Sequence, residues 1–167
     1  AYNTSWSPDG TRIAFDQNDG IDTEIKMVRS DLSGSIWSVT DDNIQEAYPI
    51  WSHDGSTIYI SAHATVGYFQ LAYLDGSSGF WPGNTYSPSF LTNEPWDHWL
   101  SGISPDGNLL TYYATPWDAG NSEAYYLDIG PGATVIGGSN PSIRVTYNSA
   151  SESSPCFLPP STAGGSV

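Results

Sequence analysis

The chain has 167 residues, of which 38% are apolar, 14% aromatic and 13% charged, and it contains 17 Gly and 12 Pro. This composition is too aromatic for a disordered chain and too interrupted by Gly and Pro for a helical bundle. No apolar run approaches the roughly 18 residues that a membrane-spanning helix needs. The formal net charge of −14 disfavours nucleic acid as a partner and favours cations, neutral sugars or basic peptides. Acidity can also serve only to keep an aromatic-rich protein soluble.

A short turn motif that follows a large apolar residue occurs three times and organises the chain. The copies are Trp-Ser-Pro-Asp-Gly at 6–10, Trp-Ser-His-Asp-Gly at 51–55 and Ile-Ser-Pro-Asp-Gly at 103–107, with spacings of 45 and 52 residues. Pro, Asp and Gly favour tight turns between strands. A repeat near this length is typical of propeller blades or other stacked units.

Alternating apolar residues between turn residues predict four short strands in each repeat. In the first repeat they lie at 4–7, 12–15, 24–28 and 35–40. In the second they lie at 48–52, 57–61, 69–74 and 89–92, and an insertion at 80–88 accounts for most of its greater length. In the third they lie at 99–103, 109–113, 123–127 and 143–147. Residues 152–157 align with the start of a further repeat.

These elements predict an all-β fold, a single β-propeller with blades of four antiparallel strands. The blades are expected at about residues 1–45, 46–97 and 98–150, with the first strand of a fourth at 151–167. Neighbouring blades bury the two apolar faces of each sheet, and ring closure protects its edges. Three blades do not close a ring, because propellers typically need about four to eight. Two explanations fit: the propeller is part of a longer polypeptide, or copies associate to complete a ring. The first is favoured because the chain begins and ends at the same point of the repeat.

The motifs themselves are similar to those of a known family. Trp-Ser-Pro-Asp-Gly at 6–10, Ile-Ala-Phe at 13–15, and Asp-Gly with Glu-Ile at 19–25 resemble the TolB-like propeller repeat, also called the PD40 or WD40-like beta repeat. Residues 6–40 match best, and 46–92 and 99–147 match well at their starts. The resemblance implies a propeller of about six to eight blades. It carries over no catalytic residue, because the shared residues build turns. The family includes periplasmic scaffold proteins, propeller domains of prolyl-oligopeptidase-like peptidases, and surface or secreted proteins.

Five oxygen-bearing side chains after the second strand form a candidate calcium loop: Asp16, Asn18, Asp19, Asp22 and Glu24. Oxygen ligands grouped around a Gly are what Ca²⁺ needs. The EF-hand spacing fails, however, because only three residues separate Gly20 from Glu24. The ordinary hairpin of this repeat explains the same residues without a metal, and no other cofactor is predicted.

Aromatic side chains gather in the predicted connections and indicate a binding site. Trp81 lies in the insertion, Trp96 and His98 lie in the connection to the third repeat, and Trp117 lies in a long hairpin. Connections on one rim of a propeller can converge, and exposed Trp suits stacking on sugar rings or gripping of peptide side chains. The alternative is that these Trp side chains cover the core between blades, as we expect for Trp99 at the start of a strand.

The sequence contains no Gly-x-Ser-x-Gly nucleophile elbow and no phosphate-binding Gly loop. Cys156, the single cysteine, is expected to be a buried small residue rather than a nucleophile. Few basic residues with abundant Ser, Thr, Asn and Tyr suit a secreted, periplasmic or cell-surface protein. We therefore expect a non-catalytic binding or scaffold module that holds a protein or a glycan. The alternatives are the substrate-gating propeller of a larger hydrolase, and a structural surface protein that assembles into rings or fibres.

Overall fold

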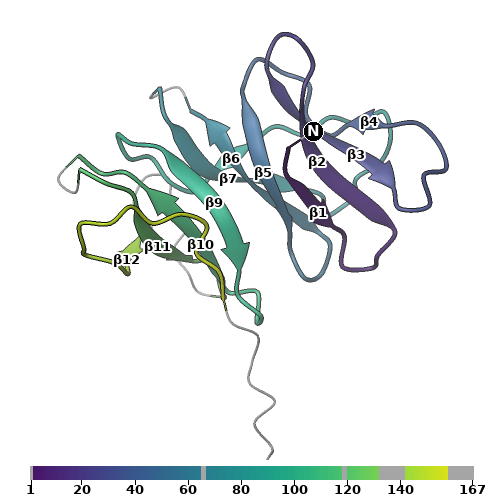
Figure 1. Ribbon diagram of the computed structural model, residues 1–167. Helices are drawn as coiled ribbons and strands as arrows, with labels where there is room; N and C mark the ends of the chain where they lie inside the picture. Colours follow the sequence, from purple (N-terminus) through teal and green to yellow (C-terminus); the bar gives the residue numbers. More distant parts are fainter. Residues whose placement is uncertain (1, 65–66, 118–119, 132–141, 158–167) are drawn as a thin grey trace, which may run out of the picture.

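The computed structural model describes residues 2–64, 67–117, 120–131 and 142–157. These residues form twelve β-strands and no helix, so no helix in the described part is long and apolar enough to cross a membrane. The strands build three four-stranded sheets that lie side by side (Figure 1). The prediction of an all-β fold made of four-stranded blades is confirmed.

Each sheet consists of four consecutive strands paired in chain order, and every pairing is antiparallel. Blade one contains β1 (Thr4–Trp6), β2 (Arg12–Asn18), β3 (Thr23–Arg29) and β4 (Trp37–Ser38). Blade two contains β5 (Glu46–Trp51), β6 (Thr57–His63), β7 (Phe69–Asp75) and β8 (Ser89–Phe90). Blade three contains β9 (His98–Ile103), β10 (Leu109–Ala114), β11 (Glu123–Asp128) and β12 (Ile143–Arg144).

The repeated motif forms the same turn in all three blades, between the first and second strands. In the first copy, Ser7 Oγ donates a hydrogen bond of 2.6 Å to Asp9 Oδ1, which also accepts the N–H of Thr11 at 3.0 Å. The equivalent Ser-to-Asp bonds measure 2.7 Å in blade two and 2.5 Å in blade three. The Gly has a φ of 70°, 74° and 77° in the three copies, a backbone conformation that L side chains disfavour. The motif is therefore a structural element, as the sequence indicated.

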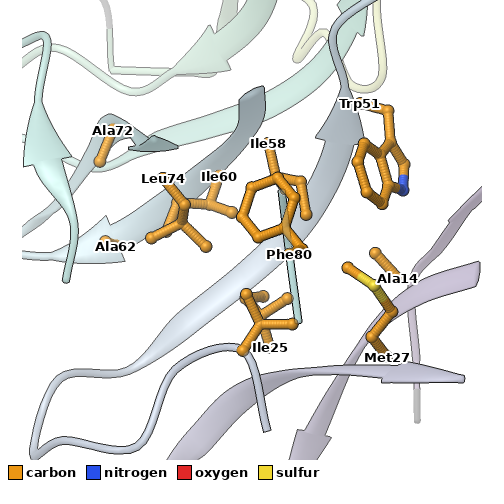
Figure 2. Close-up of a cluster of buried hydrophobic side chains, with 11 residues drawn as sticks. Ala14, Ile25, Met27, Trp51, Ile58, Ile60, Ala62, Ala72, Leu74 and Phe80 are labelled. Carbon is orange, nitrogen blue, oxygen red and sulfur yellow. The ribbon is translucent and has the colours of Figure 1, made fainter. Parts of the chain in front are cut away.

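Two apolar clusters hold the blades together. Between blades one and two, Ala14, Ile25 and Met27 pack with Ile58 and Ile60, and all five side chains are fully buried (Figure 2). A second cluster joins blade two to blade three and includes Leu71, Leu91, Leu100, Leu110, Tyr112 and Leu127. Each fully buried side chain of this size contributes about 1.5–3 kcal/mol relative to exposure.

The insertion of blade two has a structural role, because Phe80 anchors it in the core. Phe80 is 1% exposed, and its ring centroid lies 5.3 Å from that of Trp51 and 4.8 Å from that of Tyr86. A Cβ atom on Gly76 would lie 2.1 Å from the Phe80 ring, so a residue with a side chain at position 76 would displace the anchor.

Residues 152–157, predicted to begin a fourth unit, form no β-ladder with the described residues. They lie against blade three, where the Pro155 carbonyl accepts hydrogen bonds from the hydroxyls of Ser101 and Thr111. Between blades one and two, the backbone N–H of Trp51 donates to the Ser5 hydroxyl. Cys156 is exposed rather than buried as predicted, because none of the described strands pairs with this segment.

The connections alternate between the two ends of each blade, since consecutive strands run in opposite directions. We call the end with the turns at 7–10, 52–55 and 104–107 the turn face. The other end is the far face, which carries the hairpins that begin after Asn18, His63 and Ala114 and the connections from one blade to the next.

Candidate functional site

An aromatic hollow of about 480 Å³ lies on the far face between blades two and three. Residues from three connections and from the start of β9 line it: Tyr68, Pro95, Trp96, Asp97, Trp99, Thr115 and Trp117. Its size is typical of small-ligand pockets.

The aromatic side chains of the hollow differ in how firmly they are held. The Trp99 ring lies 4.5 Å from Phe69 and 5.7 Å from Tyr48, measured between centroids. Trp117 is 80% exposed. One wall is therefore fixed by packing, whereas the other is a large apolar surface open to solvent. Two aromatic faces of this kind suit a sugar ring or an apolar peptide side chain.

Some polar groups at the hollow form hydrogen bonds that fix the surrounding connections. Asp97 Oδ1 accepts the backbone N–H of Phe69 at 2.8 Å, which ties the connection between blades two and three to β7. Gln70 Nε2 donates to the carbonyls of Glu94 and Trp96 at 2.9 and 3.0 Å. The connection that carries Trp96 is thereby set in place from within the blade.

His98 lies beneath the hollow instead of lining it. Its side chain is 1% exposed, with Nδ1 3.1 Å from Gln70 Oε1 and 3.3 Å from Thr92 Oγ1. Burial lowers the pKa of His98 to about 3. Glu94 Oε2 is 3.6 Å from Nε2, beyond hydrogen-bonding distance, and burial raises the pKa of Glu94. His98 is thus a neutral positioning residue and does not reach a ligand on the rim.

Trp81 lies on the turn face, away from the hollow. It is 59% exposed, its Nε1 donates to the Ser78 carbonyl at 2.7 Å, and it lines a separate pocket with Arg12, Arg29 and Trp37. The structure therefore brings Trp96 and Trp117 together and does not bring Trp81 to them. The physical reason is the antiparallel sheet, because the connection after β7 leaves the end opposite to the hairpin after β10. Trp99 and Tyr68 also line the hollow, although the sequence predicted Trp99 as core.

A second feature is a buried polar site that recurs in each blade near the start of its third strand. A Thr hydroxyl accepts a backbone N–H at 2.9 Å in all three: Ile25 to Thr40, Leu71 to Thr92 and Ala124 to Thr146. The Thr side chain takes the place of a backbone acceptor, which explains why the fourth strands end earlier than predicted. The residue before each N–H points its side chain into the site: Glu24, Gln70 and Glu123.

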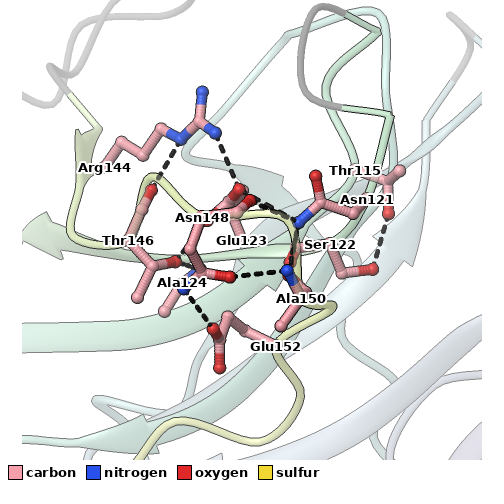
Figure 3. Close-up of polar contacts among 10 residues, drawn as sticks. All are labelled: Thr115, Asn121, Ser122, Glu123, Ala124, Arg144, Thr146, Asn148, Ala150 and Glu152. Carbon is pink, nitrogen blue, oxygen red and sulfur yellow. Dashed lines mark hydrogen bonds and ion pairs between the residues drawn. The ribbon is translucent and has the colours of Figure 1, made fainter.

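Blades two and three balance the charge of this site internally. In blade two the residue equivalent to Glu24 is the uncharged Gln70, which contacts the neutral His98. In blade three, Glu123 Oε1 lies 2.8 Å from Arg144 Nη2, and Glu123 Oε2 accepts the Thr146 hydroxyl at 2.5 Å (Figure 3). The hydrogen bond from Thr146 and then the Arg144 guanidinium hold the pKa of Glu123 below its usual value.

Blade one places two carboxylates in the same site. Glu24 and Glu46 are both 0% exposed. Glu24 Oε1 accepts the backbone N–H of Asp42 at 3.1 Å, and Glu46 Oε2 accepts the Thr40 hydroxyl at 3.1 Å. Burial, followed by the charges of Asp42 and Glu24, raises the pKa of Glu46 to about 9, and burial raises that of Glu24.

The five calcium candidates from the sequence separate into two groups. Asp16 turns away, because its two carboxylate oxygens accept hydrogen bonds from Tyr2, Asn3 and Tyr48. Asn18 caps its own turn by accepting the Gly20 N–H at 2.9 Å. Asp19, Asp22 and Glu24 belong to the acidic region of blade one: Asp19 lies close to Glu24 and Asp41, and Asp22 is buried with Oδ1 unpartnered among the described residues. Sequence reasoning missed Asp41, Asp42 and Glu46, which alignment of the three repeats with one another could have found.

The architecture is that of known propellers. No family model and no curated protein matches the sequence. Among solved structures, TolB from Acinetobacter baumannii aligns with a TM-score of 0.66 and 21% identity, over 90% of this chain and 33% of that chain. A putative TolB from Agrobacterium tumefaciens aligns with a TM-score of 0.64 and 21% identity, over 93% of this chain and 49% of that chain. This chain has the TolB-like β-propeller fold.

The TolB-like chain spans at most about half the length of these TolB structures. Prolyl oligopeptidase B from Galerina marginata, bound to a 35mer hydrolysis and macrocyclization substrate, aligns with a TM-score of 0.53 and 14% identity, over 79% of this chain and 19% of that chain. Such identities carry the fold and no residue roles, so the roles of Trp99 and Trp117 rest on the geometry of this chain.

Proposed function

We propose that the TolB-like blades form a non-catalytic binding or scaffold module that acts outside the cytoplasm and holds a protein or a glycan in the far-face hollow. The observation that carries the proposal is the pairing of a packed Trp99 with an 80% exposed Trp117 across one pocket. Exposure of the large apolar Trp117 ring to water is unfavourable. A bound sugar ring or apolar side chain would cover this surface.

The chemistry of the hollow favours binding over catalysis. Among the described residues no histidine lines the hollow, the adjacent His98 is buried and neutral, and one Asp97 oxygen is bound to the backbone of Phe69. Stacking needs no proton transfer, whereas general acid–base chemistry needs a titratable group within reach of the substrate. The location outside the cytoplasm rests on the composition, with only four Lys and Arg against 18 Asp and Glu.

The second candidate is a propeller that presents substrate to a hydrolase domain. The observation that favours it is the likeness to the propeller of prolyl oligopeptidase B, of which this chain covers 19%. Sequencing of the complete gene distinguishes the two, because a downstream Ser-Asp-His domain would decide for the hydrolase.

The binding proposal is tested by comparing two exposed tryptophans on opposite faces. We expect the chain to capture ligands on glycan or peptide arrays, and we expect Trp117→Ala to weaken capture by about tenfold or more, a typical effect of removing an aromatic anchor. The matched control is Trp81→Ala, which removes an exposed Trp from the turn face and should leave capture unchanged. Both variants should keep the melting temperature. Absence of capture on both arrays, or an equal loss in both variants, would refute the hollow as the binding site.

A further inference from the structure

The polar site of blade one contains an electrostatic imbalance that the other two blades avoid. Glu24 and Glu46 are fully buried, yet Glu24 Oε2 and Glu46 Oε1 have no hydrogen-bond partner among the described residues. Carboxylate oxygens of Glu24, Asp42 and Glu46 all lie within 4.8 Å of one another. Buried carboxylates at this spacing repel one another and lack the solvation of water, so either a bound proton or a cation must neutralise them.

The protein itself supplies a cation in blade three but not in blade one. Arg144 neutralises Glu123 in blade three at 2.8 Å. The chain has four Lys and Arg residues, and all of them lie in the described part. Lys26 donates to Ser38, Arg12 contacts Asp9 and the Phe80 carbonyl, and Arg29 lines the turn-face pocket. None of the four forms an ion pair with Glu24, Asp42 or Glu46.

We propose that blade one binds a calcium ion between the carboxylates of Glu24, Asp42 and Glu46. The donor set consists of oxygen atoms alone, which suits a hard cation. Further oxygens lie close by, because Glu24 also comes within 4.8 Å of ligand atoms of Asp19 and Asp41. An irregular set of many carboxylates matches the six to eight flexible ligands of Ca²⁺ better than the strict octahedron of Mg²⁺.

The position of the ligands gives the ion a structural role. Glu24 belongs to β3 of blade one, Asp42 to the connection between blades, and Glu46 to β5 of blade two. One ion would therefore join two blades and the loop between them, on the same far face as the aromatic hollow. In blade three Arg144 balances the charge of Glu123 without a metal, but this pair lies within a single blade.

The test is calcium titration of the chelator-treated 167-residue chain, followed by calorimetry and thermal unfolding. We expect saturable binding of one Ca²⁺ ion, and a rise in Tm of about 5–10 °C at a hundredfold excess over the dissociation constant. The same concentration of Mg²⁺ should produce a smaller rise. No heat of binding and no change in Tm at millimolar Ca²⁺ would overturn the proposal, and would indicate instead that Glu24 and Glu46 share a proton.

Two variants make the test independent of simple loss of folding. Glu46→Gln should raise the Tm in chelator, because an amide no longer repels Glu24, and should remove the rise with Ca²⁺. The double variant Glu24→Gln with Glu46→His copies the Gln70 and His98 pair of blade two, so it should fold and should not respond to Ca²⁺. Asp31→Asn, an exposed carboxylate at a turn after β3, is the control and should respond like the parent chain. A calcium response that persists in the double variant would overturn the proposal, since it would reflect general screening of the acidic surface.

Discussion

Replacement of His98 tests whether the buried site of blade two is neutral, and the structure sets the size of the effect. The imidazole is 1% exposed and its pKa is lowered to about 3, against about 6.5 in an unfolded chain. Below pH 6.5 His98 binds a proton in the unfolded chain but stays neutral in the folded chain. Stability from this group is therefore fully present above pH 6.5 and is lost as the pH falls toward 3.

The loss approaches about 1.4 kcal/mol per pH unit, so that the free energy of unfolding should fall by about 2 kcal/mol between pH 7 and pH 5 through His98 alone. Carboxylates also titrate in this range, and the comparison must cancel them. His98→Gln keeps a polar side chain of similar size and does not titrate. We expect the parent chain to lose about 2 kcal/mol more than this variant in urea unfolding at the two pH values. Equal losses would refute the argument and would mean that Glu94, 3.6 Å from Nε2, stabilises a charged His98 in the folded chain.

Two further predictions concern the frame of the propeller. Phe80→Ala should lower the free energy of unfolding by about 3–5 kcal/mol, because it removes a fully buried ring. The same change at the exposed neighbour Trp81 should have little effect. Similar urea midpoints for the two variants would show that the insertion is not anchored. Gly55→Val should cost about 1 kcal/mol or more, because φ is 74° and the new Cβ would lie 3.3 Å from Pro8 Cγ. Gly55→Asn is the control, since Asn tolerates this backbone region, and an unchanged midpoint for Gly55→Val would count against the turn.

Much of the fold was predictable from the sequence because its signals are local. The Ser-x-Asp-Gly turn contains its own stabilising contacts, with Ser7, Asp9 and Thr11 bonded within four residues of one another. The alternation of apolar residues at the start of β6 reports burial directly, as Ile58 and Ile60 show. The fourth strands were predicted too long, because the effect of Thr40 on the backbone of Ile25 acts across 15 positions of the chain.

The candidate sites were predicted less well, because they depend on which ends of the strands meet. Trp96 and Trp117 were expected together and do line one hollow, while Trp81 was expected there and lies on the other face. The face on which a loop lies depends on which two strands it joins, because successive connections leave opposite ends of the blade. Trp81 follows the third strand of its blade, whereas Trp117 follows the second. Burial of His98 was also hidden, because its partners Gln70 and Thr92 come from a different blade.

The sequence by itself determined the repeating unit, because turns and strand periodicity depend on interactions among neighbours along the chain. Only the tertiary structure decided how each blade balances its buried polar site. Glu123 is neutralised by Arg144, Gln70 is matched to His98, and Glu24 is left facing Glu46. The partners in these pairs are 21, 28 and 22 positions apart. Glu123 meets Arg144 when β12 pairs with β11, and the other two pairs meet only when neighbouring sheets pack. Charge balance in a low-dielectric interior is a property of the folded arrangement, so the facing of the proposed calcium ligands Glu24 and Glu46 does not follow from the order of residues alone.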